Sequence, residues 1–240
     1  MRIGILVSGR GTNLRNLVER GFNVAAVATN RPACPAVEFA RERGLALGVF
    51  SQKAYGSAGE RDSAMAAWLR DRGVELVVAA GWDRVLSDGF VAAFPDRVIN
   101  VHPSLLPAFA GGMDAVEQAL AHGVKITGCT VHLITSAVDG GPILLQAAVP
   151  VLDGDTPETL HERIQREEHR ILPEAIQLME KEVRSEGRPS DSVGRWVAAK
   201  EAPSTGGSVL ANTRPRSAEA DAGSGPHGGR SAPRAFRSHL

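Results

Sequence analysis

Residues 3–14, with the sequence IGILVSGRGTNL, join a short apolar run to a glycine-containing loop and the beginning of a helix. The run Ile3–Val7 is apolar at nearly every position, which is typical of a parallel strand that is covered on both faces. Glycines in the loop allow the backbone to turn sharply and to approach a ligand, and the helix start adds free N–H groups and a positive dipole end. The stretch therefore predicts an α/β fold with a phosphate-binding loop after its first strand.

The spacing of this loop argues against a dinucleotide site. Residues 9–14 read G-x-G-x-x-L and lack the third glycine of a dinucleotide fingerprint. The second predicted strand ends in Ala28-Thr29-Asn30, without the acidic residue that would bind a ribose. A single terminal phosphate fits this loop better than NAD. Glycine in a tight strand-to-helix turn also occurs for packing alone, so the loop by itself does not decide the function.

The alternation of strand and helix continues over the first hundred residues. Predicted strands lie at 3–7, 24–28, 45–49, 76–80 and 98–101, and predicted helices at 13–19, 35–43, 60–72 and 87–94. Pro35 suits the first turn of a helix and Ser87 suits an N-cap. This alternation predicts a Rossmann-like, open and mostly parallel twisted sheet with helices on both faces.

The pattern changes after residue 101. A loop and a short helix at 113–122 precede two longer strands at 125–134 and 142–151, with Thr127, Cys129 and Val131 on one face. We expect these strands to form an antiparallel pair that extends the sheet. A final helix is predicted over 156–183, and Pro173 inside it should kink or divide that helix.

Composition separates the last part of the chain from the rest. Residues 1–184 have the pattern of one folded domain, whereas 185–240 are rich in Gly, Ser, Pro, Ala and Arg and lack apolar periodicity. Such a segment cannot bury enough apolar surface to offset its ordering entropy, so we predict a low-complexity, disordered tail. Only residues 193–199, around Trp196, have the pattern of a short helix.

The overall composition excludes several classes of protein. The 240 residues contain 27 basic and 27 acidic side chains, so no net field favours nucleic acid or a membrane surface. Aromatic residues make up 5%, which disfavours a stacking surface for single-stranded nucleic acid. The two cysteines, Cys34 and Cys129, form neither a disulfide framework nor a metal cluster. A cytoplasmic protein without a metal is the expectation, since histidines such as His132 and His161 also show no ligand spacing.

The stretch 99–107, INVHPSLLP, carries the clearest chemical signal. Asn100 and His102 are two residues apart at the end of a predicted strand, so their side chains point to the same side. An amide and an imidazole together can stabilise an oxyanion and move a proton. Asp139 lies farther along, in an Asp-Gly-Gly turn. A histidine before proline and an aspartate before glycine are also ordinary loop residues, so their significance depends on their occurring together.

Four segments occur in one order along the chain and resemble the phosphoribosylglycinamide formyltransferase family, which uses 10-formyltetrahydrofolate. They are SGRGTNL at 8–14, AGWDR at 80–84, NVHPSLLP at 100–107 and DGGPI at 139–143. The third is highly specific for the wider formyl-folate transferase superfamily, and the first singles out the glycinamide branch. The similarity covers about residues 1–180.

The resemblance implies a set of site residues and an activity. The substrate phosphate and ribose would be bound by Gly11, Thr12, Asn13 and Glu168. The folate would be bound by Asp83, Arg84, Val85, Leu86 and Asn100. The catalytic trio would be Asn100, His102 and Asp139. The implied reaction moves the formyl group of 10-formyltetrahydrofolate to the amine of glycinamide ribonucleotide and gives formylglycinamide ribonucleotide in de novo purine biosynthesis.

The resemblance further implies small-molecule substrates, no metal, no nucleic acid or membrane partner, and a monomer or homodimer. Three alternatives remain at this point. A formyltetrahydrofolate hydrolase would be expected to carry an additional N-terminal regulatory domain, and a methionyl-tRNA formyltransferase an additional C-terminal β-barrel domain. A catalytically silent nucleotide-binding module would share the loops without the chemistry.

Three departures from the family pattern affect these expectations. Ala58 stands where Arg or Lys is usual, which removes one charge contact unless Arg61 replaces it. Asp83 stands where an apolar residue is usual and could perturb the folate slot. Residues 110–114 lack the histidine that many relatives carry, so any support it gives Asp139 is absent.

Overall fold

A computed structural model of the chain describes residues 1–185, so the predicted tail and the short helix at 193–199 lie outside the described residues. The strands are β1 (Ile3–Val7), β2 (Val24–Thr29), β3 (Leu47–Val49), β4 (Leu76–Ala79), β5 (Val98–His102), β6 (Ile126–Leu133) and β7 (Ile143–Pro150). The helices are α1 (Thr12–Glu19), α2 (Pro35–Glu42), the 3-10 helix η1 (Gln52–Ala54), α3 (Ala58–Asp71), α4 (Asp88–Ala92), α5 (Ala115–Ala121) and α6 (Pro157–Ser185).

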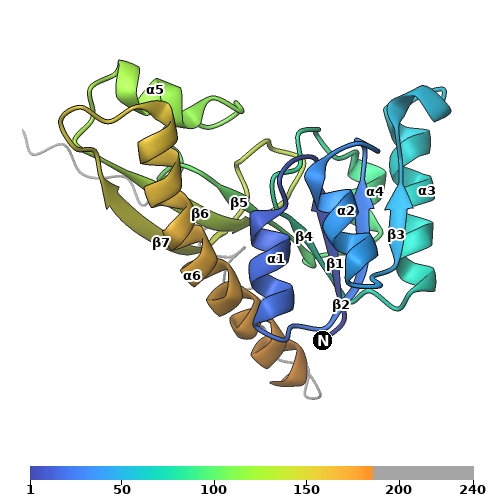
Figure 1. Cartoon of the computed structure of the whole chain (residues 1–240). Coiled ribbons are helices and arrows are strands. Elements are labelled where there is room, and N and C mark those ends of the chain that lie inside the picture. The colour runs from blue at the N-terminus through green and yellow to red at the C-terminus, as the bar shows by residue number, and fades with distance from the viewer. Residues whose placement is uncertain (186–240) are drawn as a thin grey trace, which may run out of the picture. The chain divides into compact units, whose positions relative to one another are not determined.

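The seven strands form one sheet in the order β3-β2-β1-β4-β5-β6-β7 (Figure 1). The five strands from β3 to β5 pair in parallel, whereas β6 runs antiparallel to both β5 and β7. The predicted open sheet and its antiparallel C-terminal pair are therefore confirmed. Short crossovers through helices place all the carboxyl ends of the parallel strands at one edge.

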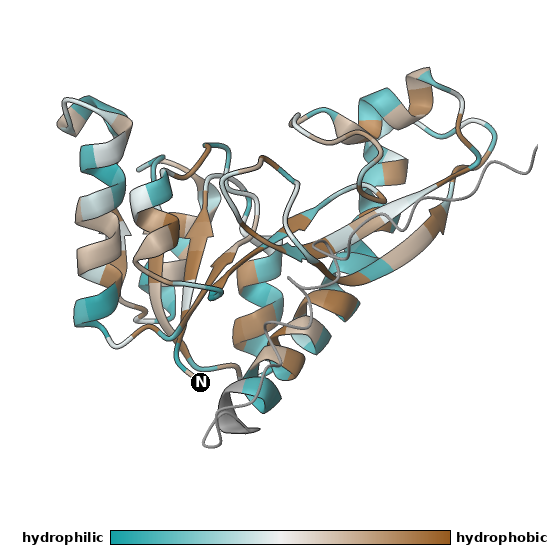
Figure 2. Ribbon diagram, turned by 180° about the vertical axis from the view of Figure 1, so that it is seen from behind, coloured by the Kyte–Doolittle hydropathy of each residue, from teal (hydrophilic) through white to brown (hydrophobic). Residues whose placement is uncertain are grey.

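Alternating side chains of the sheet belong to two separate cores. Ile3, Ile5 and Val7 pack in one cluster with residues of α1, α2 and α6, whereas Leu6 packs in a second cluster with residues of α3 and α4. Strands β1 and β4 are buried along their whole length, which explains their continuous apolar sequence. Figure 2 shows this arrangement as brown central strands between helices that carry teal on part of their surface.

Local chemistry explains several element boundaries. Pro35 lies in the first turn of α2, and the Ser87 hydroxyl accepts a hydrogen bond from the N–H of Phe90 at 3.3 Å, so both predicted helix starts are confirmed. The strand predicted from residue 45 begins instead at Leu47. Leu45 cannot join the strand because its N–H bonds to the carbonyl of Ala40 and closes the C-terminus of α2.

Helix α6 runs without a break through Pro173, so the predicted division of this helix is wrong. Proline has no N–H to donate to the carbonyl four residues earlier, which belongs to His169. The side-chain amide of Asn16, on α1, donates to that carbonyl at 2.9 Å. A neighbouring helix thus supplies the missing donor, and this contact joins α6 to the parallel half of the sheet.

Within residues 1–185, none of the helices combines the length and the apolar character needed to cross a membrane.

Candidate active site

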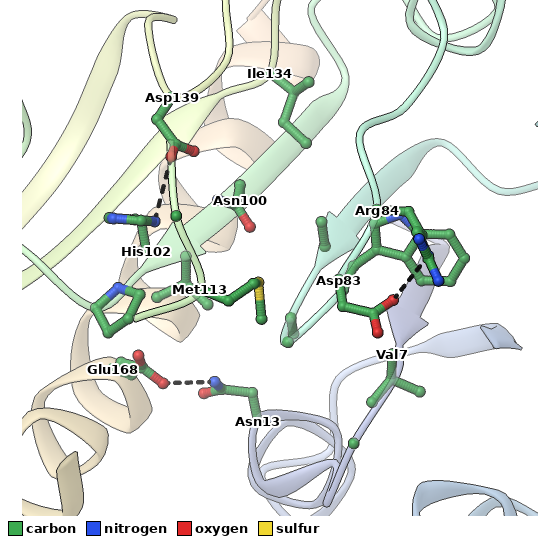
Figure 3. A pocket seen from close by; sticks show the side chains of 18 of the residues that line it. Val7, Asn13, Asp83, Arg84, Asn100, His102, Met113, Ile134, Asp139 and Glu168 are labelled. Atoms are coloured by element: carbon green, nitrogen blue, oxygen red, sulfur yellow. Dashed lines mark hydrogen bonds and ion pairs between the residues drawn. The ribbon is translucent and has the colours of Figure 1, made fainter. Parts of the chain in front are cut away.

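A cleft of about 530 Å³ opens where the carboxyl ends of β1, β4 and β5 meet the β6–β7 turn and α6 (Figure 3). This edge of an open α/β sheet is where ligands bind, because loops and helix N-termini converge there. The cleft is lined by every residue predicted for the site, namely Gly11, Thr12, Asn13, Asp83, Arg84, Val85, Leu86, Asn100, His102, Asp139 and Glu168. Residues from the two ends of the domain therefore meet in one cavity.

The glycine loop has a backbone that glycine alone can adopt easily. Gly11 precedes the first turn of α1 with φ of 70°, in the left-handed region. A Cβ atom at this position would lie 2.7 Å from the Cβ of Ala36, which is closer than real carbon contacts. The loop therefore packs directly on the start of α2 and presents the first N–H groups of α1 to the cleft.

Two side chains of α6 form hydrogen bonds with residues of the glycine loop and of the first turn of α1. The amide of Asn13 donates to Glu168 at 2.9 Å, and the amide of Gln165 donates to the hydroxyl of Thr12 at 2.7 Å. The remaining oxygen of the Asn13 amide is buried and has no hydrogen-bond partner in the described protein. Because buried polar atoms are nearly always paired, this orphan oxygen marks a place for a ligand donor such as a hydroxyl.

Glu168 is a buried carboxyl with an altered acidity. Burial raises its pKa above the ordinary value, while the hydrogen bond from Asn13 and the positive charge of Arg10 act in the opposite direction. Its oxygens face the cleft beside Asn13 in Figure 3. A carboxyl held in this way is a ready acceptor for ligand hydroxyls.

The predicted catalytic residues, Asn100, His102 and Asp139, lie across the cleft from the glycine loop. Nδ1 of His102 is 3.5 Å from Oδ2 of Asp139, and Nε2 of His102 is 3.0 Å from the carbonyl oxygen of Phe109. Both ring nitrogens thus face acceptors, and only the imidazolium form donates to both. Asn100 lies on the same side of β5 and points into the same part of the cleft (Figure 3). The convergence of these three side chains is the arrangement expected from the sequence.

His132 belongs to this cluster and was not predicted as a site residue. Its Nε2 lies 3.2 Å from Nδ2 of Asn100 and 3.6 Å from Oδ1 of Asp139. The neutral ring accepts from Asn100, and the protonated ring donates to Asp139. The signal that could have found it is the antiparallel register, which pairs Asn100 with His132 across β5 and β6.

Asp139 is the most acidic group of the cluster. A hydrogen bond from His132 and another from the N–H of Gly111, together with the charges of His102 and His132, lower its pKa to about 2 against the effect of burial. Its backbone is left-handed, with φ of 49°, which a turn aspartate tolerates. The support that the missing family histidine would give Asp139 therefore comes from His132 and from the 109–111 loop.

Two residues of α6, His161 and Gln165, line the cleft and were not predicted as site residues. His161, Gln165 and Glu168 line the cavity, and their separations of four and three residues place them on one face of α6. Only Glu168 was predicted. Burial and the charge of Arg10 lower the pKa of His161, so this ring is a neutral neighbour of the glycine loop at neutral pH.

The opposite wall of the cleft is more apolar. Val85 is 69% exposed at its rim, and Trp82 and Leu86 are buried; Met113, from the segment before α5, is 72% exposed and also lines the cleft. Exposed apolar side chains at the mouth of a cavity suit the flat face of a ring. Asp83 lines this wall, but its carboxylate is bound to Asn30 and Arg31 and therefore does not disrupt the apolar surface.

Arg61 does not replace the positive charge that is missing at Ala58. Its side chain is 2% exposed and donates to Asp62 at 2.7 and 2.8 Å, so the suggestion that Arg61 replaces the missing charge contact is wrong. The reason is that Asp62 binds Arg61 within the second core, beneath Trp82. Ala58 begins α3 and lies outside the lining of the cleft.

Within residues 1–185 no three side chains of His, Cys, Asp or Glu are arranged to hold a metal ion.

Comparisons with known proteins agree with this geometry. A family model described as formyl transferase matches residues 1–176. The phosphoribosylglycinamide formyltransferase of Mycobacterium tuberculosis (strain ATCC 25618 / H37Rv) is 43% identical over 180 residues, which are 73% of this chain and 83% of that protein. The crystal structure of glycinamide ribonucleotide transformylase 1 from Symbiobacterium toebii superposes with a TM-score of 0.72 at 49% identity, covering 75% of this chain and 87% of that one.

A second kind of relative is much longer. The human trifunctional purine biosynthetic protein adenosine-3 is 42% identical over 184 residues, which are 74% of this chain. The match spans only 18% of that protein. The similarity to these longer relatives therefore concerns one of their parts.

Proposed function

The chain belongs to the formyl transferase family, and on this premise we propose that it transfers the formyl group of 10-formyltetrahydrofolate to the amine of glycinamide ribonucleotide. The product would be formylglycinamide ribonucleotide, an intermediate of de novo purine biosynthesis. The relatives that match over most of their length are a phosphoribosylglycinamide formyltransferase and a glycinamide ribonucleotide transformylase, which supports this substrate pair.

One observation carries the proposal: the two parts of the site face each other across a single cleft. The glycine loop and Glu168 form a polar end, and Asn100, His102 and Asp139 form a second polar group beside the apolar wall. A ligand with a phosphate, hydroxyls and an amine can reach from the first group to the second. A ring system that carries the formyl group can lie along the apolar wall.

The residues of the polar end suit glycinamide ribonucleotide. N–H groups of the loop and of the first turn of α1 bind the terminal phosphate, because they have no partners within the helix. Glu168 and the unpaired oxygen of Asn13 accept hydrogen bonds from the ribose hydroxyls. These contacts direct the glycyl amine toward His102.

Asn100 and His102 stabilise the charge that develops during transfer. The amine nitrogen forms a bond to the formyl carbon, and the carbonyl oxygen becomes an oxyanion. The amide N–H of Asn100 and the imidazolium of His102 donate to that oxygen. The bond between the carbon and the folate nitrogen then breaks, a proton leaves the attacking amine, and a proton reaches the folate nitrogen with His102 as its source.

Asp139 acts on His102 and does not itself carry the group. Its pKa of about 2 keeps it ionised at neutral pH. The Asp139 carboxylate, 3.5 Å from Nδ1 of His102, fixes the orientation of the imidazole ring. Proton transfer through a water held by Asp139 completes the cycle.

The direct test is an assay of the purified full chain with 10-formyltetrahydrofolate and glycinamide ribonucleotide, followed by the absorbance of the deformylated folate. We expect deformylation that depends on the amine. Deformylation without the amine would instead identify a hydrolase, and its absence under both conditions would identify a silent module. The expectations of a monomer or homodimer, of a cytoplasmic location and of no nucleic-acid partner stay predictions.

A further inference from the structure

Two loops that would bind the two different substrates are joined through one residue, Asp83. The glycine loop at 8–13 follows β1, and the loop at 82–87 follows β4, the neighbouring strand. Asp83 belongs to the second loop. Its N–H bonds to Ser8 of the first loop, and its carboxylate bonds to Asn30 and Arg31, which follow β2. The Asp83 side chain is 11% exposed and so lies at the junction, out of reach of most solvent.

Two polar side chains, those of Asn30 and Ser8, hold Asp83. The amide of Asn30 donates to Oδ1 of Asp83 at 2.7 Å, and the N–H of Asp83 donates to the hydroxyl of Ser8 at 3.2 Å. The same hydroxyl donates to Asn30 at 2.7 Å, which closes a ring of three hydrogen bonds. Ser8 is the first residue of the glycine loop, so the ring fixes the point at which that loop leaves the sheet.

Arg31 adds an ion pair to the other carboxylate oxygen of Asp83. The Arg31 side chain is 60% exposed, so salt screens this contact more than it screens the hydrogen bonds of the ring. The hydrogen bonds from Asn30 and to Ser8 are therefore the stronger part of the junction.

The far end of the 82–87 loop is anchored independently. The N–H of Ser87 donates to Oδ2 of Asp62 at 2.7 Å, and Arg61 holds the other oxygen of that carboxylate in the buried core. With Ser87 fixed to α3, Asp83 sets the position of the loop's beginning. The loop between them carries Arg84, Val85 and Leu86, which line the cleft.

We propose that Asp83 is a positioning residue that holds the phosphate loop and the folate loop in one fixed relation, so that its carboxylate supports the binding of both substrates. This inference rests on the proposed function. Asp83 touches neither His102 nor Asp139, so it acts on binding and not on the chemical step.

The test is the steady-state kinetics of Asp83→Ala in the full chain. We expect KM for glycinamide ribonucleotide and KM for 10-formyltetrahydrofolate both to rise, each by roughly 5- to 20-fold, because a charged hydrogen-bonded group is lost from the junction. The value of kcat should stay within about threefold of wild type. Asp83→Asn keeps an acceptor for Asn30 and should recover part of the loss in both constants.

Asp155→Ala is the matched control. Asp155 is another carboxylate bound to an arginine and to a backbone N–H in a loop, but it lies outside the lining of the cleft. We expect it to lower the melting temperature with both KM values unchanged.

The inference is overturned if Asp83→Ala changes only the KM for 10-formyltetrahydrofolate, or changes neither of the two KM values. It is equally overturned if the variant lowers kcat by as large a factor as it raises KM. It is also overturned if Asp83→Asn recovers nothing. Failure of the proposed function has a different signature, since wild type itself would then give no amine-dependent transfer.

Discussion

The two ends of the cleft are built in different ways. We call the glycine loop with Glu168 the phosphate end, and Asn100, His102 and Asp139 with His132 the catalytic end, after the roles proposed above. At the phosphate end, the backbone supplies the binding groups, and their position follows from β1, Gly11 and the first turn of α1, which are adjacent in sequence. At the catalytic end, side chains supply the chemistry, and Asn100, His132 and Asp139 come from three segments joined only by antiparallel pairing and a long turn. Changes at the first end should therefore act on folding and substrate binding, and changes at the second on the chemical step.

The largest expected effect is at the catalytic end. His102→Ala removes a donor to the oxyanion and should lower kcat on the order of 100- to 1,000-fold. Asp139→Ala should have an effect of the same kind through His102. Circular dichroism and the melting temperature should remain close to wild type, because neither side chain belongs to the two apolar clusters. Turnover near wild type in either purified variant would contradict the assigned roles.

A change at the phosphate end should act mainly on stability. Gly11→Ala places a Cβ atom 2.7 Å from Ala36 and forces alanine into the left-handed region, so we expect a loss of roughly 3 kcal/mol in the free energy of unfolding. Gly21 has a similar φ of 77°, but no atom lies within 4 Å of the place where a Cβ would stand. Gly21→Ala should therefore lower the free energy of unfolding by only about 1 kcal/mol.

Urea unfolding of the two glycine variants measures the difference. Gly11→Ala should also raise KM for glycinamide ribonucleotide while the folate constant changes less. Equal losses of stability in the two variants would mean that the loop does not pack tightly on α2.

The same contrast explains what could be predicted from the sequence. The strand, loop and helix of the phosphate end follow from glycine conformations and apolar runs within residues 3–14, and these elements are confirmed, whereas phosphate binding stays a prediction. The placement of Asn100 and His102 on one side also follows from the period of a strand. Both are local rules.

The missed features depend on contacts between distant segments. His132 enters the site only through its register opposite Asn100, 32 residues away, and the register of a pair is not fixed by either strand alone. The helix at Pro173 continues because Asn16, from another helix, replaces a lost donor. None of these partners is visible in a single stretch of sequence.

Glu168 belongs to the phosphate end, and its replacement should change substrate binding and stability in opposite directions. Because its pKa is raised in the folded chain, the ionised carboxyl lowers stability above its ordinary pKa of 4.5, and this penalty disappears as the pH falls below that value. Glu168→Gln should therefore gain about 1 to 2 kcal/mol in the free energy of unfolding at pH 7 and nothing near pH 3.5. KM for glycinamide ribonucleotide should rise in the same variant. A gain that is equal at both pH values would exclude the buried charge as its source.

The smallest expected effect concerns the hydrogen bond between Asn16 of α1 and His169 of α6. This contact keeps Glu168 beside the glycine loop. Asn16→Ala leaves the carbonyl of His169 without a donor and should lower the free energy of unfolding by about 1 kcal/mol. In a Pro173→Ala background the helix supplies its own N–H to that carbonyl, so the same Asn16→Ala change should cost clearly less.

A double-mutant cycle of these variants, measured by urea unfolding, isolates the coupling. The contact of Asn16 with Arg20 is lost equally in both backgrounds and cancels. A coupling energy near zero would mean that the helix passes Pro173 without help from Asn16. A positive coupling would show that Asn16 of α1 supports the continuity of α6, the helix that carries Glu168 beside the glycine loop.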